Sequence, residues 1–340
     1  MCASGADEPM RGPGALAAAV CVGIFNMLCL CIFLSPFAWA WAAWWAPYLV
    51  LPPLVGYALL SYDGSENRDG RPWRAFSEGW WLFRTARRYN DMQVHVDAAL
   101  SADKVTGEEQ YIFGLHPHGV TSSYRLLLDG VTRANFPKLR SWRALAASVL
   151  FRFPLMRELC LWTGCVDASR ATVERALDKG HSIFVLPGGV HEQVLAEYGE
   201  ETVYLKKRMG FVKLALSRGI PLVPGYVFGE NDAWYTFSGL QAVQMFIAKK
   251  LRMGLPVFWG RLGLPIPLQV PVRIVFGPPL QLGPAPSGGG GGNGGDGRES
   301  RDVSQEELVA AHAKYIEALV QLFDENKARF GYGDRQLRVV

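Results

Sequence analysis

The chain has 340 residues, enough for one large domain or two ordinary ones, and its composition is apolar. Hydrophobic residues make up 49% and charged residues 19%, whereas about 25% of residues are charged in ordinary soluble domains. The formal net charge of +4 comes without a dense run of Lys and Arg. This argues against nucleic acid as a partner but fits anionic headgroups or a nucleotide phosphate. The six cysteines show neither metal-ligand nor disulfide spacing, so we expect free thiols in a reducing cytosol.

The excess of apolar residues lies near the N-terminus, where no charged residue occurs between Arg11 and Asp63. Residues 15–34 are almost wholly apolar, and a helix needs roughly 20 such residues to cross a bilayer core. A second apolar stretch covers residues 39–60, and Pro36 separates the two. The pattern predicts a hairpin embedded in a membrane. A signal peptide is disfavoured because the apolar run is long and lacks a small-residue cleavage site.

Aromatic and basic residues set the expected orientation of this hairpin. Aromatic side chains typical of the headgroup level begin the second stretch, namely Trp39, Trp41, Trp44, Trp45 and Tyr48. Arginines follow the hairpin and favour the cytosol for both of its ends, namely Arg68, Arg71, Arg74, Arg84, Arg87 and Arg88. A hairpin that dips into the bilayer without crossing it is equally allowed, because Pro52 and Pro53 break the second stretch.

After residue 109, short apolar runs alternate with segments of helical spacing, which is typical of an α/β fold. The predicted strands are residues 110–115, 165–168, 182–186, 220–228 and 271–276. The predicted helices are residues 169–179, ending at Gly180, and 208–218, ending at Gly219. Because Pro221 and Pro224 fall in the fourth strand, we expect that strand to be irregular or to lie at a sheet edge.

The C-terminal part contains a glycine-rich insert and one amphipathic helix. Residues 284–300 include five consecutive glycines, typical of a disordered linker. Ser304 and Glu307 then form a capping box, followed by apolar residues at helical spacing that should pack on the domain, namely Leu308, Ala311, Tyr315, Leu319 and Leu322. The predicted organisation is a tail (1–14), a membrane-embedded helical hairpin (15–62) and a cytosol-facing α/β domain with a mixed sheet and flanking helices (63–340).

The first candidate for chemistry is a His-Pro-His-Gly sequence that directly follows a predicted strand. His116 and His118 flank Pro117, which restricts the backbone, and Gly119 follows. Open α/β folds place their sites where strands end, and histidine titrates near neutrality. The residues therefore predict a base that removes a proton from an alcohol. A polar turn and a metal site are the alternatives, although no further ligand follows at metal-binding spacing.

Three further motifs offer polar groups after apolar runs. Pro187, Gly188 and Gly189 can bring main-chain N–H groups close to an oxyanion, and Glu192 can orient an imidazole or accept a hydrogen bond from the alcohol. An ordinary turn with an exposed glutamate is the alternative. Arg208 and Lys213 are candidates for the phosphates of a nucleotide co-substrate, with two solvated charges as the alternative. The remaining candidates for a substrate cleft, or for a plain hydrophilic turn, are Glu230, Asn231 and Asp232. No GxSxG, GxGxxG or Walker loop is present.

In combination, these motifs resemble the diacylglycerol acyltransferase type 2 family, which includes monoacylglycerol and wax-alcohol acyltransferases. The matching blocks are residues 111–119 (YIFGLHPHG), 187–192 (PGGVHE), 208–216 (RMGFVKLAL), 221–224 (PLVP), 228–232 (FGEND), 259–267 (WGRLGLPIP) and 277–279 (GPP). The N-terminal hairpin fits as well. The glycine insert departs from the family but falls between blocks.

The resemblance implies an endoplasmic-reticulum enzyme, often able to reach lipid droplets, that esterifies diacylglycerol with acyl-CoA as co-substrate and without a cofactor or metal. It implies catalysis around His116 and His118, with Glu192 nearby. Soluble glycerolipid acyltransferases pair a histidine with an aspartate five residues on, but here those positions hold Thr121 and Ser123. We expect direct transfer without a covalent enzyme intermediate, and favour His118 as the base.

Two other classes of function stay open at this level. A non-catalytic membrane or lipid-droplet protein would explain the hairpin but not the constrained histidines. A lipid hydrolase is disfavoured by the missing nucleophile motif. The sequence also leaves open the acyl acceptor, the chain-length preference, homo-oligomerisation, and a plastid instead of an endoplasmic-reticulum membrane.

Overall fold

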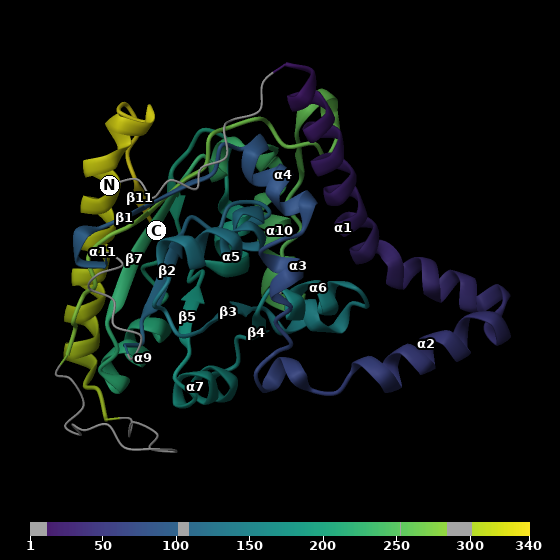
Figure 1. Cartoon of the computed structure of the whole chain (residues 1–340), viewed down its shortest axis with the longest axis horizontal. Coiled ribbons are helices and arrows are strands. Elements are labelled where there is room, and N and C mark those ends of the chain that lie inside the picture. Colours follow the sequence, from purple (N-terminus) through teal and green to yellow (C-terminus); the bar gives the residue numbers. More distant parts are fainter. Residues whose placement is uncertain (1–11, 101–108, 252, 284–300) are drawn as a thin grey trace.

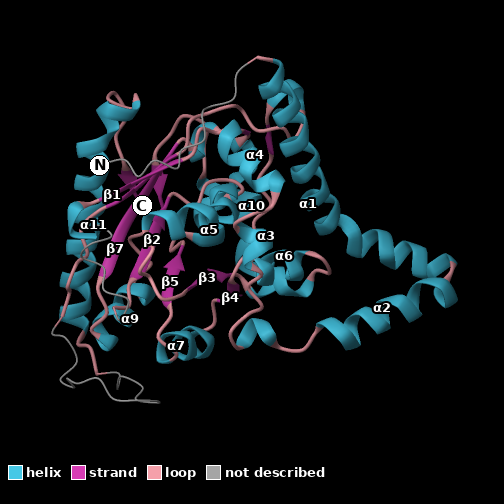
Figure 2. Ribbon diagram, in the orientation of Figure 1, coloured by secondary structure: helices cyan, strands magenta, loops and turns pink. Residues whose placement is uncertain are grey.

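The computed structural model describes residues 12–100, 109–251, 253–283 and 301–340, so the predicted glycine-rich linker lies outside the described residues. A seven-stranded sheet forms the centre, with the order β1-β10-β7-β2-β5-β3-β4. Only the β10–β7 pair is antiparallel in this sheet. Figure 1 and Figure 2 show the strands between helices, with the first half of α1 lying against the body and its second half projecting from it together with α2. The predicted α/β class with a mixed sheet is confirmed.

The strands of the central sheet are β1 (Gln93–Val96), β2 (Ile112–His116), β3 (Trp142–Ala146), β4 (Cys165–Asp167), β5 (Ser182–Val185), β7 (Leu222–Phe228) and β10 (Arg273–Phe276). Two short pairs lie outside it, β6 (Thr202–Val203) with β11 (Arg338–Val339) and β8 (Tyr235–Thr236) with β9 (Phe258–Trp259). The helices are α1 (Pro13–Trp45), α2 (Pro47–Ser61), α3 (Arg74–Ser77), α4 (Trp81–Tyr89), α5 (Ser123–Asn135), α6 (Met156–Trp162), α7 (Arg170–Asp178), α8 (Gly189–Leu195), α9 (Gly210–Arg218), α10 (Gln241–Leu251) and α11 (Gln305–Lys327).

Alternating side chains of the sheet build two apolar layers, as the two-residue period of a strand requires. In β2, Ile112 faces a core formed with α7, α9 and α11, whereas Phe113 faces a core formed with α4, α5, α6 and the first half of α1. Leu222 and Val223 of β7 divide between the same two cores. The predicted capping box of α11 is confirmed, because Ser304 and Glu307 exchange hydrogen bonds of 3.1 Å.

The prediction that residues 220–228 form an irregular or edge strand is wrong. β7 is fully buried and central, between β10 and β2. The carbonyl of Pro224 accepts a hydrogen bond from Gly277 at 2.9 Å, one residue beyond the end of β10. Since the N–H and C=O of a strand residue point the same way, the missing N–H of Pro224 faces Gly277, just beyond β10, so the proline forgoes only one hydrogen bond and the pairing resumes between Leu222 and Leu280.

The break in the N-terminal hairpin also lies elsewhere than predicted. α1 continues through Pro36 and ends at Trp45, and Ala46 separates it from α2. Pro36 cannot donate to the carbonyl of Ile32, but the Ser35 hydroxyl donates to that carbonyl at 2.7 Å instead. Among the described residues, α1 is the one helix long and apolar enough to cross a membrane. The 15 residues of α2 span only about 22 Å at 1.5 Å per residue.

A buried arginine connects the end of this hairpin to the α/β domain. Arg157 on α6 is fully buried, and its Nη2 lies 2.9 Å from Asp63 Oδ1 and 2.5 Å from Glu66 Oε2. In addition, the Tyr57 hydroxyl of α2 donates to Glu158. Since a buried cation is costly unless it is paired, these carboxylates hold the segment after α2 against α6.

Candidate active site

Three of the sequence motifs follow three adjacent parallel strands, β7, β2 and β5. The His-Pro-His-Gly sequence ends β2, the Pro-Gly-Gly sequence follows β5, and Gly229 with Glu230 follows β7. Because the strands are parallel, all three motifs meet at the carboxyl edge of the sheet. This edge is where open α/β folds bind ligands. The structure therefore brings three of the predicted motifs together at one edge of the sheet.

His116 is the last residue of β2 and is completely buried. Its Nε2 lies 3.2 Å from the hydroxyl of Tyr315 on α11, and its Nδ1 has no hydrogen-bond partner among the described residues. Gly114, two residues earlier on the same face, leaves room for this tyrosine: a Cβ there would lie 2.2 Å from the hydroxyl. Burial lowers the pKa of His116 to about 3, so its ring is neutral at physiological pH.

His118 lies two residues beyond, after the cis His116–Pro117 bond, and is only partly buried. Its Nδ1 is 3.0 Å from the carbonyl oxygen of Gly119. A carbonyl only accepts hydrogen bonds, so this contact selects the tautomer that carries the proton on Nδ1. Nε2 then carries the lone pair. Burial lowers the pKa of His118, which keeps that lone pair available at neutral pH.

Glu192 on α8 is buried and binds main-chain groups instead of an imidazole. One carboxylate oxygen accepts a hydrogen bond from the main-chain N–H of His118, and the other accepts one from Tyr204 at 2.7 Å. The carboxyl therefore positions the His-Pro-His turn through its backbone. Burial raises the pKa of Glu192 to about 7, against the lowering effect of the two N–H donors.

The Pro-Gly-Gly turn brings Gly188 against Glu192: a Cβ at Gly188 would lie 2.1 Å from Oε2 of the carboxyl. Gly189 has a φ of +53° and begins α8, whose first N–H groups have no partner within the helix. Pro187 forms the preceding turn. The positive φ of Gly189 and the close contact at Gly188 explain why both positions are glycine. The N–H groups at the start of α8 remain available as donors.

Arg208 lies inside this arrangement, before the start of α9. Its Nη2 donates to His191 Nδ1 at 2.7 Å and to the Gly188 carbonyl at 3.3 Å, and its guanidinium lies 5.2 Å from the centre of the Tyr204 ring. Lys213 is exposed on α9. Lys206 and Lys207, which the sequence motifs did not single out, are also exposed beside Arg208.

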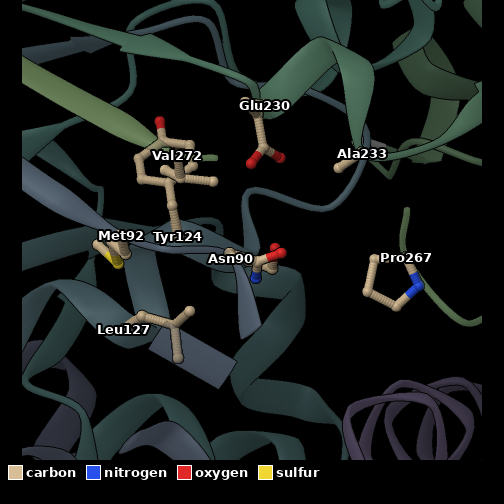
Figure 3. Close-up of a pocket in the computed structure, with 9 residues that line it drawn as sticks. Asn90, Met92, Tyr124, Leu127, Glu230, Ala233, Pro267 and Val272 are labelled. Atoms are coloured by element: carbon tan, nitrogen blue, oxygen red, sulfur yellow. The ribbon is translucent and has the colours of Figure 1, made fainter. Parts of the chain in front are cut away.

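Glu230 approaches the His-Pro-His-Gly turn from the β7 side. A Cβ at Gly119 would lie 2.3 Å from its Cγ, so only glycine fits there, at a φ of +63°. The Glu230 carboxyl is buried, its Oε1 has no partner among the described residues, and burial raises its pKa well above the ordinary value. It lines a small, mainly apolar cavity with Asn90, Met92, Ser123, Tyr124, Leu127, Ala233, Pro267 and Val272 (Figure 3).

Asn231 and Asp232 do not line this cavity. The Asn231 amide donates to the Glu200 carbonyl at 2.8 Å, and Asp232 lies 3.0 Å from Arg335 Nη1. The same guanidinium nitrogen also lies 2.8 Å from Glu201. Asn231 thus fastens the turn after β7 to the segment before β6, and Asp232 fastens it to the C-terminal segment. In the described part of the chain, no cluster of His, Cys, Asp and Glu side chains is arranged to hold a metal ion.

Replacing Glu192 by Gln should change how stability depends on pH. The folded protein holds the Glu192 proton up to about pH 7, whereas the ordinary pKa is 4.5. The unfolded chain therefore releases this proton first, and folding becomes less favourable as the pH rises from 4.5 to 7. Relative to Glu192→Gln, wild type should lose roughly 3 kcal/mol over this window.

Unfolding in detergent micelles across a pH series measures this difference, because all other titrating groups are common to the two proteins. A stability difference that stays constant from pH 4.5 to 7 would contradict the burial of an ionisable carboxyl at this position.

Comparison with known proteins gives several relatives. "2-acylglycerol O-acyltransferase 3" of Homo sapiens is 33% identical over 270 residues, which cover 74% of this chain and 72% of the relative. "Diacylglycerol O-acyltransferase 2" of Mus musculus is 29% identical over 301 residues, or 83% of this chain and 72% of the relative. For "Diacylglycerol O-acyltransferase 1" of Eremothecium gossypii, at 29% identity, the match covers 76% of this chain but only 56% of the relative.

No solved structure gives a significant match to this chain. The diacylglycerol acyltransferase family model matches residues 43–340, which include every motif of the candidate site. The chain therefore belongs to the diacylglycerol acyltransferase family of acyltransferases.

Proposed function

We propose that this enzyme transfers an acyl group from acyl-CoA to the hydroxyl of a neutral lipid, with diacylglycerol as the favoured acceptor. Monoacylglycerol and long-chain alcohols are the alternative acceptors. The names of the relatives support an acylglycerol. Because the chain belongs to a family of acyltransferases, we propose catalysis and not a purely lipid-binding role.

The observation that carries the mechanism is the geometry of His118. Its Nδ1–H donates to the Gly119 carbonyl, so its Nε2 is the nitrogen that can accept a proton. His116 is a weaker candidate for the base, because it is fully buried and its Nε2 already contacts the Tyr315 hydroxyl. In this proposal His118 is the base, and His116 positions the end of β2.

The reaction proceeds in one transfer. Nε2 of His118 removes the proton from the lipid hydroxyl as the oxygen attacks the thioester carbonyl of acyl-CoA. The C–S bond then breaks, and the CoA sulfur leaves and takes up the proton from the imidazolium. No covalent acyl-enzyme forms. Main-chain N–H groups at Gly188 and Gly189 stabilise the oxyanion of the tetrahedral intermediate.

Cations beside the glycine turn suit the phosphates of CoA. Lys213 is exposed, as are Lys206 and Lys207 in the preceding segment. Arg208 holds the Gly188 carbonyl and His191, so it stabilises the turn beneath the phosphates and adds positive potential to it. Acyl-CoA is a co-substrate in this account, and no resident cofactor is required.

Glu230 is our candidate for recognition of the lipid acceptor. Its raised pKa keeps the carboxyl protonated, and a buried neutral acid is a hydrogen-bond donor. An ester carbonyl of an acylglycerol would satisfy this donor once the acceptor widens the cavity, which in the structure has room for little more than a water molecule.

We further propose that α1 and α2 anchor the enzyme in the endoplasmic-reticulum membrane, with the α/β domain in the cytosol and access to lipid-droplet surfaces. The length and hydrophobicity of α1 and the arginines that follow α2 support this topology. Homo-oligomerisation is compatible with it.

Replacing His118 by Ala should lower kcat for acyl transfer by roughly 10²- to 10⁴-fold, the usual contribution of a positioned general base. The assay follows radiolabelled acyl-CoA into lipid products with a panel of acceptors, so the same experiment identifies the favoured alcohol. His181→Ala is the control, because His181 lies at the opposite edge of the sheet, 2.6 Å from Ser141. Near-normal kcat in His118→Ala would overturn the assignment of the base, and wild type that acylates no acceptor would overturn the function.

Substitutions of Glu230 test acceptor recognition. Glu230→Gln keeps a hydrogen-bond donor and should retain most activity, whereas Glu230→Leu leaves the ester carbonyl without a partner. We expect Glu230→Leu to raise KM for the lipid acceptor about tenfold, corresponding to one lost buried hydrogen bond, with KM for acyl-CoA unchanged. Equal kinetics of the two variants would contradict this role.

A further inference from the structure

A second apolar surface lies outside α1 and α2, on the segment between β8 and β10. We define it by its exposed large hydrophobic residues, namely Phe237, Leu240, Val243, Phe246, Leu255, Val257, Trp259, Leu262 and Leu264. Leu262 is 93% exposed at a turn where its φ is +56°. Isolated apolar side chains are normal on a protein surface, but a cluster of this extent marks an interaction site.

Helix α10, which contributes to this surface, buries a glutamine and exposes large apolar side chains. Its buried side chains include Gln244 and Ala248, four residues apart, and α10 packs against α8. The outward side chains include Val243 and Phe246, which are 55% and 63% exposed. A soluble protein would place polar residues on the outward face.

The charged residues of the segment that carries this surface are all basic, and at its border Gln241 of α10 donates to the Glu197 carboxyl at 2.9 Å. No Asp or Glu occurs between Ala233 and Gly295, whereas Lys249, Lys250 and Arg261 are exposed next to the apolar residues. Basic residues beside exposed Trp, Phe and Leu are typical of segments that lie in the headgroup region of a membrane. A protein partner with an acidic rim would match the lysines and the arginine. It would not match the many apolar side chains, which are spread over turns and a short helix.

The segment that carries the second apolar surface contacts both the membrane helix α1 and the helix α8 of the candidate active site. Gly23 of α1 lies against Ile266, since a Cβ there would be 2.5 Å from Cγ1 of that isoleucine. On the inner side, Gly254 approaches Gln193 of α8 so closely that a Cβ would lie 2.1 Å from its Oε1. The segment thus lies between α1 and the helix that carries Glu192.

We infer that the second apolar surface inserts into the interface of the same bilayer that holds α1, with the lysines on anionic headgroups. The enzyme would then contact the membrane at two places, and α8 with its catalytic turn would face the lipid from which the acceptor comes. α2, at about 22 Å, is shorter than a bilayer core of about 30 Å. A second contact of this kind would hold the domain down on the membrane. The inference uses the proposed function only for membrane attachment through α1.

Depth-dependent quenching in liposomes tests the inference directly. An environment-sensitive fluorescent amino acid replaces Phe246 or Leu262 in the full-length protein, reconstituted in vesicles that contain phosphatidylserine. Quenchers on the lipid acyl chains should reduce the fluorescence at both positions, and aqueous iodide should not. The same label at Val309, which is 47% exposed on α11, should respond only to iodide.

Quenching at positions 246 and 262 by iodide alone would overturn the inference. So would shielding from both quenchers, because a protein partner or a second copy would then cover the surface. This readout does not depend on acyl transfer, so its failure is distinct from failure of the proposed function.

Kinetics supply a second test. The double substitution Val243→Ser and Phe246→Ser should raise KM for vesicle-borne acceptor about tenfold and leave kcat unchanged, while Val309→Ser should change neither. Lys249→Gln with Lys250→Gln should weaken the response of KM to anionic lipid, since each lysine near an anionic surface contributes roughly fivefold to binding. Unchanged KM in all of these variants would contradict a lipid contact at this surface.

Discussion

The candidate site depends on one buried interaction, the contact of the Glu192 carboxyl with two main-chain N–H groups. One belongs to His118 in the turn after β2, and the other belongs to Tyr204 in the segment that leads to α9. A carboxyl group is costly to bury unless its oxygens are hydrogen-bonded, so the donors must be held in place around it. The Glu192 carboxyl therefore joins the turn after β2 and the segment before α9 into one rigid unit. This unit orients His118.

Once the turn is fixed, the chemistry of its two histidines differs because their environments differ. His116 is sealed against α11 and stays neutral. His118 is partly accessible, and a carbonyl oxygen on Nδ1 selects its tautomer. Although His116 and His118 are two residues apart in the sequence, they have separate tasks in the proposed mechanism: His118 is the base, and His116 positions the end of β2. Glu230, from a third strand end, packs against the same turn and faces an apolar cavity.

The acceptor is oil-soluble and acyl-CoA carries a charged nucleotide, so the proposed reaction requires a site between a membrane and water. α1 provides an apolar surface on one side, and the segment from β8 to β10 contacts both α1 and α8. The exposed lysines near α9 lie on the nucleotide-binding side in our proposal. The arrangement explains why apolar residues occur so densely outside the core.

The sequence predicted the α/β class, the strands that lead into the three motifs and the helix with the capping box, because these depend on local patterns. It failed where distant contacts decide. β7 is central although Pro224 lies in it, because the carbonyl of that proline still accepts from Gly277 and Leu222 pairs with Leu280 on its other side. α1 passes through Pro36 because the neighbouring serine replaces a hydrogen bond. Tyr315 contacts His116 from 199 residues away, and no local pattern could have indicated that pairing.

The turn that the buried Glu192 carboxyl holds should present a neutral His118 with its proton on Nδ1. Nitrogen-15 NMR of histidine-labelled protein in micelles measures this directly, with His118→Gln used to identify the resonance. We predict a neutral ring at pH 7 whose Nδ1 is protonated and whose Nε2 is not. A ring protonated on Nε2, or on both nitrogens, would contradict the account, because that nitrogen could not accept a proton from the lipid hydroxyl.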